Sequence, residues 1–151
     1  MLTVVIQAGG ESRRMGQDKA LLPFLGKPLI PRLIDRVAPL AQEVLVTPNR
    51  PDAYQFLGLP LVQDIIPGRG ALGGLYTALS AATQPLVAVV ACDMPFASRG
   101  LLAAERDLLL ATGSAAVIPR TDGGTEPFHA VYRRATCLPP LPASLSSDRL
   151  P

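Results

Sequence analysis

The chain of 151 residues is 48% hydrophobic and 17% charged, which is enough apolar sequence to bury one core without disulfides, so a single domain is expected. Its formal net charge is only +2. A general nucleic-acid-binding surface is therefore not expected, because such domains carry a strong basic excess.

The predicted elements begin with a strand over residues 2–8, a continuous apolar run rich in β-branched residues and closed by Gly9 and Gly10. This pattern is typical of a strand buried on both faces of a parallel sheet. A helix is predicted over 28–40, where apolar residues recur at helical spacing and Pro39 weakens the end. The later predictions are, in chain order, strands over 43–47 and 59–62, a helix within 71–83, a strand over 85–91, a helix over 101–110, and strands over 115–119 and 128–132.

Strands that alternate with helices predict an α/β fold with a mostly parallel sheet, helices on its faces and right-handed crossovers. Ligands of such sheets bind beyond the carboxyl ends of the strands. In this sequence the polar, glycine-rich and acidic segments follow predicted strand ends, namely Gly9 onward, Asn49, 64–74 and Asp93. We therefore expect the ligand site at that edge of the sheet.

The cysteines and the N-terminal apolar run bear on where the protein works. Cys92 and Cys137 lie far apart in sequence and outside any CxxC or Cys/His cluster, so we expect reduced thiols in a cytoplasmic protein. The apolar run meets glycines after a few residues, which is too short for a signal-peptide core or a bilayer span. No membrane partner is expected.

The segment AGGESRRMGQDKALL, residues 8–22, predicts a phosphate-binding loop. Gly9 and Gly10 let the backbone turn sharply and bring N–H groups close to an anion, which a Cβ would obstruct. Lys19 supplies a mobile charge for a phosphate. Arg13, or the arginine after it, is expected to contact phosphate, the alternative being solvent-exposed loop charges. The common GxxxxGK[ST] and GxGxxG fingerprints do not occur in the sequence.

Two aspartates and one histidine are further candidates for the site. Asp93 ends a predicted buried strand, where a carboxylate can hold Mg²⁺, a cation that prefers oxygen ligands; alternatively it caps the next helix or turn. Asp64 precedes IIPG, where an aspartate on its own more often starts a turn. His129 is the only histidine in the chain, so a histidine-based triad or multi-histidine metal site cannot form, and a position in the wall of the site is expected.

Several motifs, found in one order along the chain, resemble those of a known family. AGGESRRMGQDKALL resembles the signature LAGGxSxRMGxDKAL of the molybdenum cofactor guanylyltransferases and their relatives. The family's later motifs are matched by Asn49-Arg50, by Asp64 ahead of PGRGALGGL, by the CDMP segment at 92–95 and by GTEPFHAVYR at 124–133. The resemblance runs from about residue 3 to about residue 134.

The resemblance implies a three-layer, Rossmann-like nucleotidyltransferase fold of the glycosyltransferase-A-like kind, with a mostly parallel central sheet. It implies an enzyme that moves GMP from GTP to molybdopterin with Mg²⁺ as cofactor and releases pyrophosphate. Transient contact with molybdoenzymes or cofactor-biosynthesis proteins is a further expectation. Catalytic roles are expected for Lys19, Arg13 and Asp93, with the metal on Asp93. The nucleotide contacts expected, from the residues and from matching positions together, are Gln7, Ala8, Gly9, Gly10, Lys19, Asn49, Asp64, Gly73 and Asp93.

Two of these contacts have a physical basis of their own. Gln7 stands where the family often has leucine, and its side-chain amide could lie near the base or the ribose. Gly73 and Gly74 are expected to open a helix, where the positive dipole end and unpaired amides could approach a phosphate or the base.

The end of the chain departs from the family's pattern. After Arg134 the sequence ATCLPPLPASLSSDRLP is rich in proline and serine and shows no evident period. We therefore expect a nucleotidyltransferase domain over 1–134 that is incomplete at its C-terminal side, followed by a poorly ordered tail over 135–151. Family members usually continue with a helix, further strands and a segment whose asparagines line the active site.

Other functions fit the same loop and metal. A cytidylyltransferase for the same cofactor and a nucleotidyltransferase acting on a sugar phosphate share them, because guanine is implied by the resemblance alone. From a different class comes a catalytically inactive nucleotide-binding or partner-binding module, which the unusual C-terminus favours.

Overall fold

The computed structural model describes residues 1–8, 23–24, 27–48, 50–93 and 97–146. Within these ranges the largest sheet has five strands in the order β4-β1-β5-β9-β6. Their bounds are β1 Leu2–Gln7, β4 Glu43–Thr47, β5 Leu86–Ala91, β6 Ala116–Val117 and β9 His129–Arg133. β1 pairs in parallel with β4 and β5, whereas β9 runs antiparallel to β5 and β6. The predicted mostly parallel sheet is confirmed.

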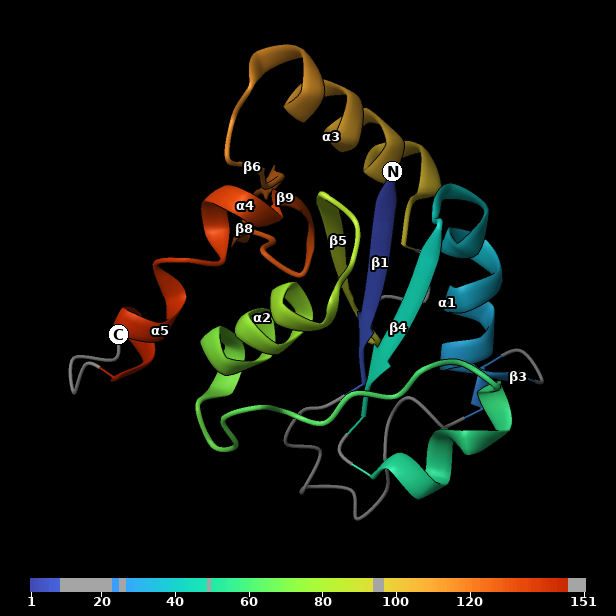
Figure 1. Ribbon diagram of the computed structural model, residues 1–151. Helices are drawn as coiled ribbons and strands as arrows, with labels where there is room; N and C mark the ends of the chain where they lie inside the picture. Colours follow the sequence, from blue (N-terminus) through green and yellow to red (C-terminus); the bar gives the residue numbers. More distant parts are fainter. Residues whose placement is uncertain (9–22, 25–26, 49, 94–96, 147–151) are drawn as a thin grey trace.

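Helices cover both faces of this sheet (Figure 1). α1 (Leu29–Val37) and α3 (Arg99–Thr112) lie on one side, and α2 (Gly70–Ala81) and α5 (Leu141–Ser146) lie on the other. The three-layer arrangement is therefore as expected. The shorter elements are the 3₁₀ helices η2 Ala38–Leu40 and η3 Pro51–Leu57, the helix α4 Arg134–Cys137, and the hairpins of β2 Pro23–Phe24 with β3 Lys27–Pro28 and of β7 Arg120–Thr121 with β8 Gly124–Thr125. None of the described helices is long and apolar enough to cross a membrane.

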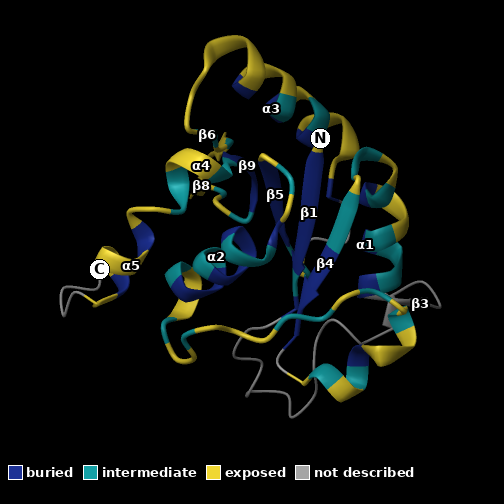
Figure 2. Cartoon of the chain, in the orientation of Figure 1, coloured by how far each residue is buried: buried dark blue, intermediate teal, exposed yellow. Residues whose placement is uncertain are grey.

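β1 lies in the middle of the core because both of its faces are apolar. Leu2, Val4 and Ile6 are fully buried in the layer that contains α1 and α3. Val5 is fully buried on the opposite face, together with residues of α2. Burial of each such side chain stabilises the fold by about 1.5–3 kcal/mol, so these side chains together favour the position of β1 in the middle of the core. Figure 2 shows β1 and β5 buried along nearly their whole length.

Two consecutive arginines, the last residue of β9 and the first residue of α4, bind the ends of helices on opposite faces. Arg133 donates from Nη2 to Leu109 O of α3 at 3.2 Å, and from Nε to the backbone just beyond that helix. Arg134 donates from Nε to Leu79 O of α2 at 2.7 Å and from Nη2 to Ser80 O at 3.3 Å. The last carbonyls of a helix carry partial negative charge, so both arginines act as C-terminal caps, although Leu109 O also accepts from Gly113 N at 3.0 Å.

The predicted strand over 59–62 is only a single bridge. Leu61 bridges to Val46 in parallel, with backbone hydrogen bonds from Val46 N to Pro60 O (3.0 Å) and from Val62 N to Val46 O (2.9 Å). Pro60 has no N–H to donate to a ladder, which limits the pairing.

The segment after Arg134 contains helices that the sequence analysis did not predict. Leu141 and Leu145 of α5 are buried, and α5 packs against α2. Leu138, Leu141 and Leu145 recur at helical spacing, and this short apolar stripe is the physical reason for the packing. The expectation of a tail without regular structure is wrong for residues 135–146, and residues 147–151 lie outside the described ranges.

Candidate functional site

The carboxyl ends of three parallel strands meet at one edge of the sheet. Gln7, at the end of β1, lies level with the last residues of β4 and β5. Beyond the strands, Ala8 N donates to Thr47 O at 3.1 Å and Cys92 N donates to Gln7 O at 2.9 Å. Ala8 and Asp93 therefore leave the sheet from neighbouring strands at the same level. The grouping of these two predicted site residues at one edge agrees with the expected place of the ligand.

The first turn of α2 corrects one expectation about Gly73. α2 begins at Gly70, and the Gly73 amide donates to Arg69 O at 3.2 Å inside the helix, so it is not available to a ligand. Gly73 is buried, and an added Cβ would lie 2.8 Å from Arg69 Cβ and 3.3 Å from Ile66 O. Its lack of a side chain instead lets the preceding loop pack closely on the helix. In a helix that begins here, the amides without intrahelical acceptors belong to residues 69–72.

Gly74 brings the backbone of α2 against the side chain of Gln7. A Cβ on Gly74 would lie 2.8 Å from Gln7 Nε2 and 3.3 Å from both Cδ and Oε1. The Gln7 Nε2 atom is buried, and no described residue accepts a hydrogen bond from it. A buried donor without an acceptor costs about 1–3 kcal/mol. Gln7 Nε2 is therefore a buried donor, at the carboxyl edge of the sheet, for which the described residues supply no acceptor.

Asp64 is exposed, and a buried threonine holds the backbone beside it. Ile65 N donates to Thr77 Oγ1 at 3.0 Å, and Thr77 Oγ1 donates to Gly73 O at 3.1 Å. Thr77 is fully buried in α2. Thr77 is not among the predicted site residues, although a polar residue within the buried part of an otherwise apolar helix is a signal that such a bond exists.

Five predicted site residues lie outside the described part of the chain. They are Gly9, Gly10, Arg13, Lys19 and Asn49. Their roles remain predictions from the sequence. The described residues Gln7, Ala8 and Asp93 lie at the carboxyl edge, and Asp64 lies in the segment that leads into α2.

Comparison with known proteins decides the family. Residues 4–150 match the MobA-like NTP transferase domain. The chain belongs to this family. Because the match covers nearly the whole sequence, it includes the Asp64 and Asp93 segments, the buried helix α2 and the described C-terminal helices of this MobA-like domain.

Named relatives and a solved structure agree with this assignment. The chain is 41% identical over 137 residues to a protein of Carboxydothermus hydrogenoformans named probable molybdenum cofactor guanylyltransferase, covering 89% of this chain and 66% of that protein. It is 35% identical over 132 residues to the molybdenum cofactor guanylyltransferase of Syntrophotalea carbinolica, covering 87% and 63%. The crystal structure of molybdopterin-guanine dinucleotide biosynthesis protein A from Archaeoglobus fulgidus matches with a TM-score of 0.78 and 25% identity, over 95% of this chain and 72% of that one. The chain spans slightly less than two thirds of the length of these two curated relatives.

The surroundings of Asp93 fit a magnesium ion in this MobA-like domain. Asp93 is exposed and directly follows Cys92, whose amide is fixed to the end of β1. Mg²⁺ usually takes one or two protein carboxylates, and waters and phosphate oxygens complete its octahedron. An exposed carboxylate such as that of Asp93 suits that mode better than it suits a closed protein cage.

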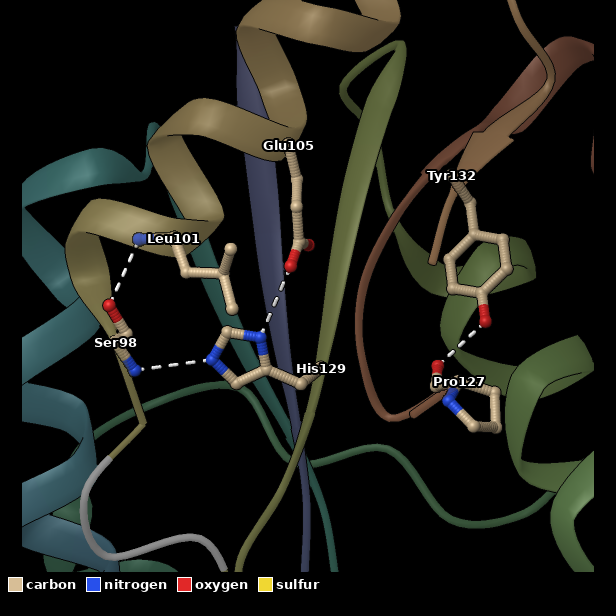
Figure 3. A network of polar contacts seen from close by, with 6 residues as sticks. All are labelled: Ser98, Leu101, Glu105, Pro127, His129 and Tyr132. Carbon is tan, nitrogen blue, oxygen red and sulfur yellow. Dashed lines mark hydrogen bonds and ion pairs between the residues drawn. The ribbon is translucent and has the colours of Figure 1, made fainter. Parts of the chain in front are cut away.

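His129 and Glu105 form a buried polar pair between β9 and α3 (Figure 3). His129 is 6% exposed and Glu105 is 3% exposed. The His129 Nδ1 atom lies 3.4 Å from Glu105 Oε1, and Ser98 N donates to His129 Nε2 at 3.1 Å. The hydrogen bond to Glu105 raises the pKa of His129 against the opposing effect of burial. The position of His129 in the wall of the site stays a prediction, because its described partners are Ser98 and Glu105.

Tyr132 lies on the other face of β9. Its hydroxyl donates to Pro127 O at 2.6 Å, as Figure 3 shows. Burial raises the pKa of Tyr132 to about 12, so this phenol stays protonated at neutral pH and serves as a structural donor.

Proposed function

We propose that this MobA-like domain transfers GMP from GTP to molybdopterin and releases pyrophosphate. The observation that carries the proposal is the arrangement at the carboxyl edge of the sheet, where Ala8 and Asp93 leave neighbouring strands and the Gln7 amide faces α2. Ligands of open α/β sheets bind at this edge. The names of the two relatives, and of the solved structure, support guanylyl transfer to the molybdenum cofactor.

The proposed roles divide between the nucleoside and the triphosphate. Gln7 and Asp64 would contact the nucleoside, as would the predicted contact Asn49. The amides of Gly9 and Gly10 would bind the triphosphate, together with the side chains of residues 13 and 19. Asp93 would hold Mg²⁺, which supplies positive charge against the phosphates when bound.

The reaction needs little covalent chemistry from the protein. A phosphate oxygen of molybdopterin attacks the α-phosphorus of GTP in line, and the bond from that phosphorus to the bridging oxygen breaks as pyrophosphate leaves. Lys19, Arg13 and the loop amides would offset the negative charge that develops on the leaving group. Removing one such donor typically costs roughly 10²- to 10³-fold in rate.

The proposal includes the setting in which the reaction runs. We place it in the cytoplasm, where GTP and Mg²⁺ are both plentiful. Transient contact with molybdoenzymes or with other cofactor-biosynthesis proteins would deliver the acceptor and receive the product.

A comparison of thermal protection by GTP and by CTP tests the choice of base. A ligand present at 100 times its Kd adds about 2.7 kcal/mol of stability, so the nucleotide that binds more tightly raises the melting temperature more. At the same concentration, GTP with Mg²⁺ should therefore raise the melting temperature more than CTP with Mg²⁺. Stronger protection by CTP would refute the guanylyl assignment and favour a cytidylyltransferase. Pyrophosphate release with GTP, Mg²⁺ and molybdopterin tests the chemistry, and GTP binding without any release would instead support an inactive nucleotide-binding module.

Lys19→Ala tests the loop directly. Turnover should fall roughly 10²- to 10³-fold, because a preorganised cation is lost from the leaving group, while the melting temperature of the ligand-free protein stays close to wild type. Arg106→Ala is a suitable control, since Arg106 forms an ion pair with its exposed neighbour Asp107 on α3. Equal activities of the two variants would remove Lys19 from the mechanism.

A further inference from the structure

Ser98 joins the start of α3 to the sheet. Its Oγ accepts from Leu101 N at 3.0 Å and its carbonyl accepts from Leu102 N at 3.0 Å, so the first turn of the helix is built on this residue. Its own amide donates away from the helix, to His129 Nε2 at 3.1 Å on β9 (Figure 3). This last bond connects residues 31 positions apart in the sequence and holds the first turn of α3 against β9.

The other ring nitrogen of His129 faces a buried carboxylate of the same helix. His129 Nδ1 lies 3.4 Å from Glu105 Oε1, and both side chains are buried. Because Ser98 donates its N–H to Nε2, that nitrogen must present a lone pair, and the neutral ring must carry its proton on Nδ1, toward Glu105. In this state both ring nitrogens have partners on α3 or at its cap.

Uptake of a second proton by the ring has opposite effects on its two partners. Glu105 Oε2 is buried and no described residue donates to it, so this carboxylate is poorly compensated while the ring is neutral. A protonated ring gives the carboxylate an opposite charge beside it. The added proton lies on Nε2, however, where it faces the Ser98 N–H, and two donors cannot bond to each other. The protonated ring and the bond to Ser98 therefore exclude each other.

We propose that His129 couples proton uptake to a local opening at the start of α3. The neutral ring holds Ser98 against β9, and the protonated ring pairs with Glu105 and releases Ser98. The ring must turn, or the first turn of α3 must move, before the Nε2 proton can reach an acceptor or water. The opening is confined to this end of the helix, because Arg133 holds the other end separately, from Nη2 to Leu109 O at 3.2 Å.

The charges around the ring favour proton uptake. The hydrogen bond to Glu105 is the main cause that raises the pKa of His129 above its ordinary value of 6.5, against the opposing effect of burial, and the charge of Glu126 ahead of β9 adds to it. On β5 the ring's strand partner is Val90, which is uncharged. Arg133, further along β9, is bound to the far end of α3.

The raised pKa also fixes how the whole fold responds to pH. His129 contributes most to stability below pH 6.5 and loses that contribution as pH rises through the raised folded-state value. Acid should therefore open the start of α3 while the pair of His129 and Glu105 stabilises the rest of the fold.

Amide hydrogen exchange in the full chain measures the opening. The protection factor of the Ser98 amide, corrected for the intrinsic pH dependence of exchange, should fall by up to about tenfold per pH unit as pH drops through the midpoint of the His129 titration, because opening takes up one proton. The Gly113 amide, which donates to Leu109 O at 3.0 Å at the other end of α3, is the internal control. A Ser98 protection factor that stays constant across the midpoint, or that changes in parallel with that of Gly113, would overturn the inference.

The ring itself gives a second measurement. His129 is the only histidine in the chain, so its ring ¹⁵N signals need no assignment, and they report both the midpoint and the tautomer. Above the midpoint the shifts should show the proton on Nδ1. A neutral ring with its proton on Nε2 could not accept from Ser98, and this result would overturn the inference.

Three variants identify the groups responsible. His129→Gln replaces the ring with a side chain that does not titrate, so it should remove the pH dependence of Ser98 protection. Glu105→Gln removes the charge that attracts the proton, and it should lower the pH at which this protection falls. Asp107→Asn removes an exposed carboxylate from the same helix, and as the matched control it should leave that pH unchanged.

The same pH dependence in His129→Gln and in the wild type would overturn the inference. If the substitutions at the buried pair prevent folding, the wild type, Asp107→Asn and the ring tautomer still decide the question. None of these measurements needs a substrate, so their outcome does not depend on the proposed function.

Discussion

Thr77→Val removes one hydroxyl from the buried face of α2 and leaves the shape of the side chain almost unchanged. The Ile65 N–H then loses its acceptor at 3.0 Å, and the hydrogen bond to Gly73 O is lost as well. An amide left without a partner costs about 1–3 kcal/mol, while valine and threonine have similar helix propensities. For a domain of this size each kcal/mol lowers the melting temperature by roughly 2–4 °C. We therefore expect a fall of about 2–12 °C.

Thermal unfolding followed by circular dichroism measures the fall in melting temperature, and urea unfolding measures the loss of free energy, with Thr112→Val as the matched control. Thr112 Oγ1 makes the same kind of bond, to Leu108 O at 2.8 Å, but in an exposed position near the end of α3. Water can replace that bond, so the control should lose less than about 0.5 kcal/mol. The Thr77 variant should also show weaker thermal protection by GTP, because Asp64 directly precedes Ile65. Equal losses in the two variants would refute the argument that burial of Thr77 makes its hydroxyl important.

Two further predictions concern the packing at each end of the sheet. Gly74→Ala should lower the free energy of unfolding by about 1–3 kcal/mol, because the new Cβ would lie 2.8 Å from Gln7 Nε2. Adding Gln7→Ala should recover most of this loss. A loss that the second substitution leaves unchanged would show that the strain lies elsewhere. Burial acts to raise the pKa of Glu43, but hydrogen bonds from Thr83 N and the Thr3 hydroxyl outweigh it and leave the pKa below 4.5. Glu43 thus stabilises the fold above its unfolded-state pKa and loses this effect as pH falls through its folded-state pKa. Glu43→Gln should therefore lower the free energy of unfolding at pH 7 and lower it less near pH 3.5. An equal loss at both pH values, measured by urea unfolding, would contradict the assignment.

The main elements of the fold could be predicted because their apolar patterns are long. The strand at 43–47 has the predicted bounds, and those of the strands at 2–7 and 86–91 differ from prediction by one residue at one end. Both faces of β1 and β5 are buried, so an unbroken apolar run is the pattern that such strands require. The helix at 99–112 extends beyond the predicted 101–110 because Ser98 caps its start and Gly113 ends it at a φ of 69°.

The elements missed by prediction are short and depend on tertiary contacts. η3 begins at Pro51 and ends before Gly58, at a φ of 67°, and a start at proline with a stop at glycine was the available signal. α5 has only six residues, too few to be stable without the contacts of Leu141 and Leu145 with the rest of the fold. A stripe of two or three leucines among prolines is too short for periodicity alone to establish a helix.

The candidate site shows the same limit. The positions of Ala8 and Asp93 followed from strand ends and from the rule that ligands bind there, so they could be predicted. The close approach of Gly74 to Gln7 and the bond between Ser98 and His129 join residues far apart in sequence, and spacing carries no signal for such pairs. The expected contribution of the Gly73 amide failed because the helix starts three residues earlier than the Gly-Gly pair suggested.

The two capping arginines have a mechanical consequence for this site. Helix α2 starts near the carboxyl edge of the sheet and ends where Arg134 caps it, and α3 ends where Arg133 caps it. Both helices are therefore tethered at their distal ends to one dipeptide. A pull along the axis of α2 would load Arg134 and a pull along α3 would load Arg133, and these two residues are consecutive in the chain, so the dipeptide couples the two helix layers.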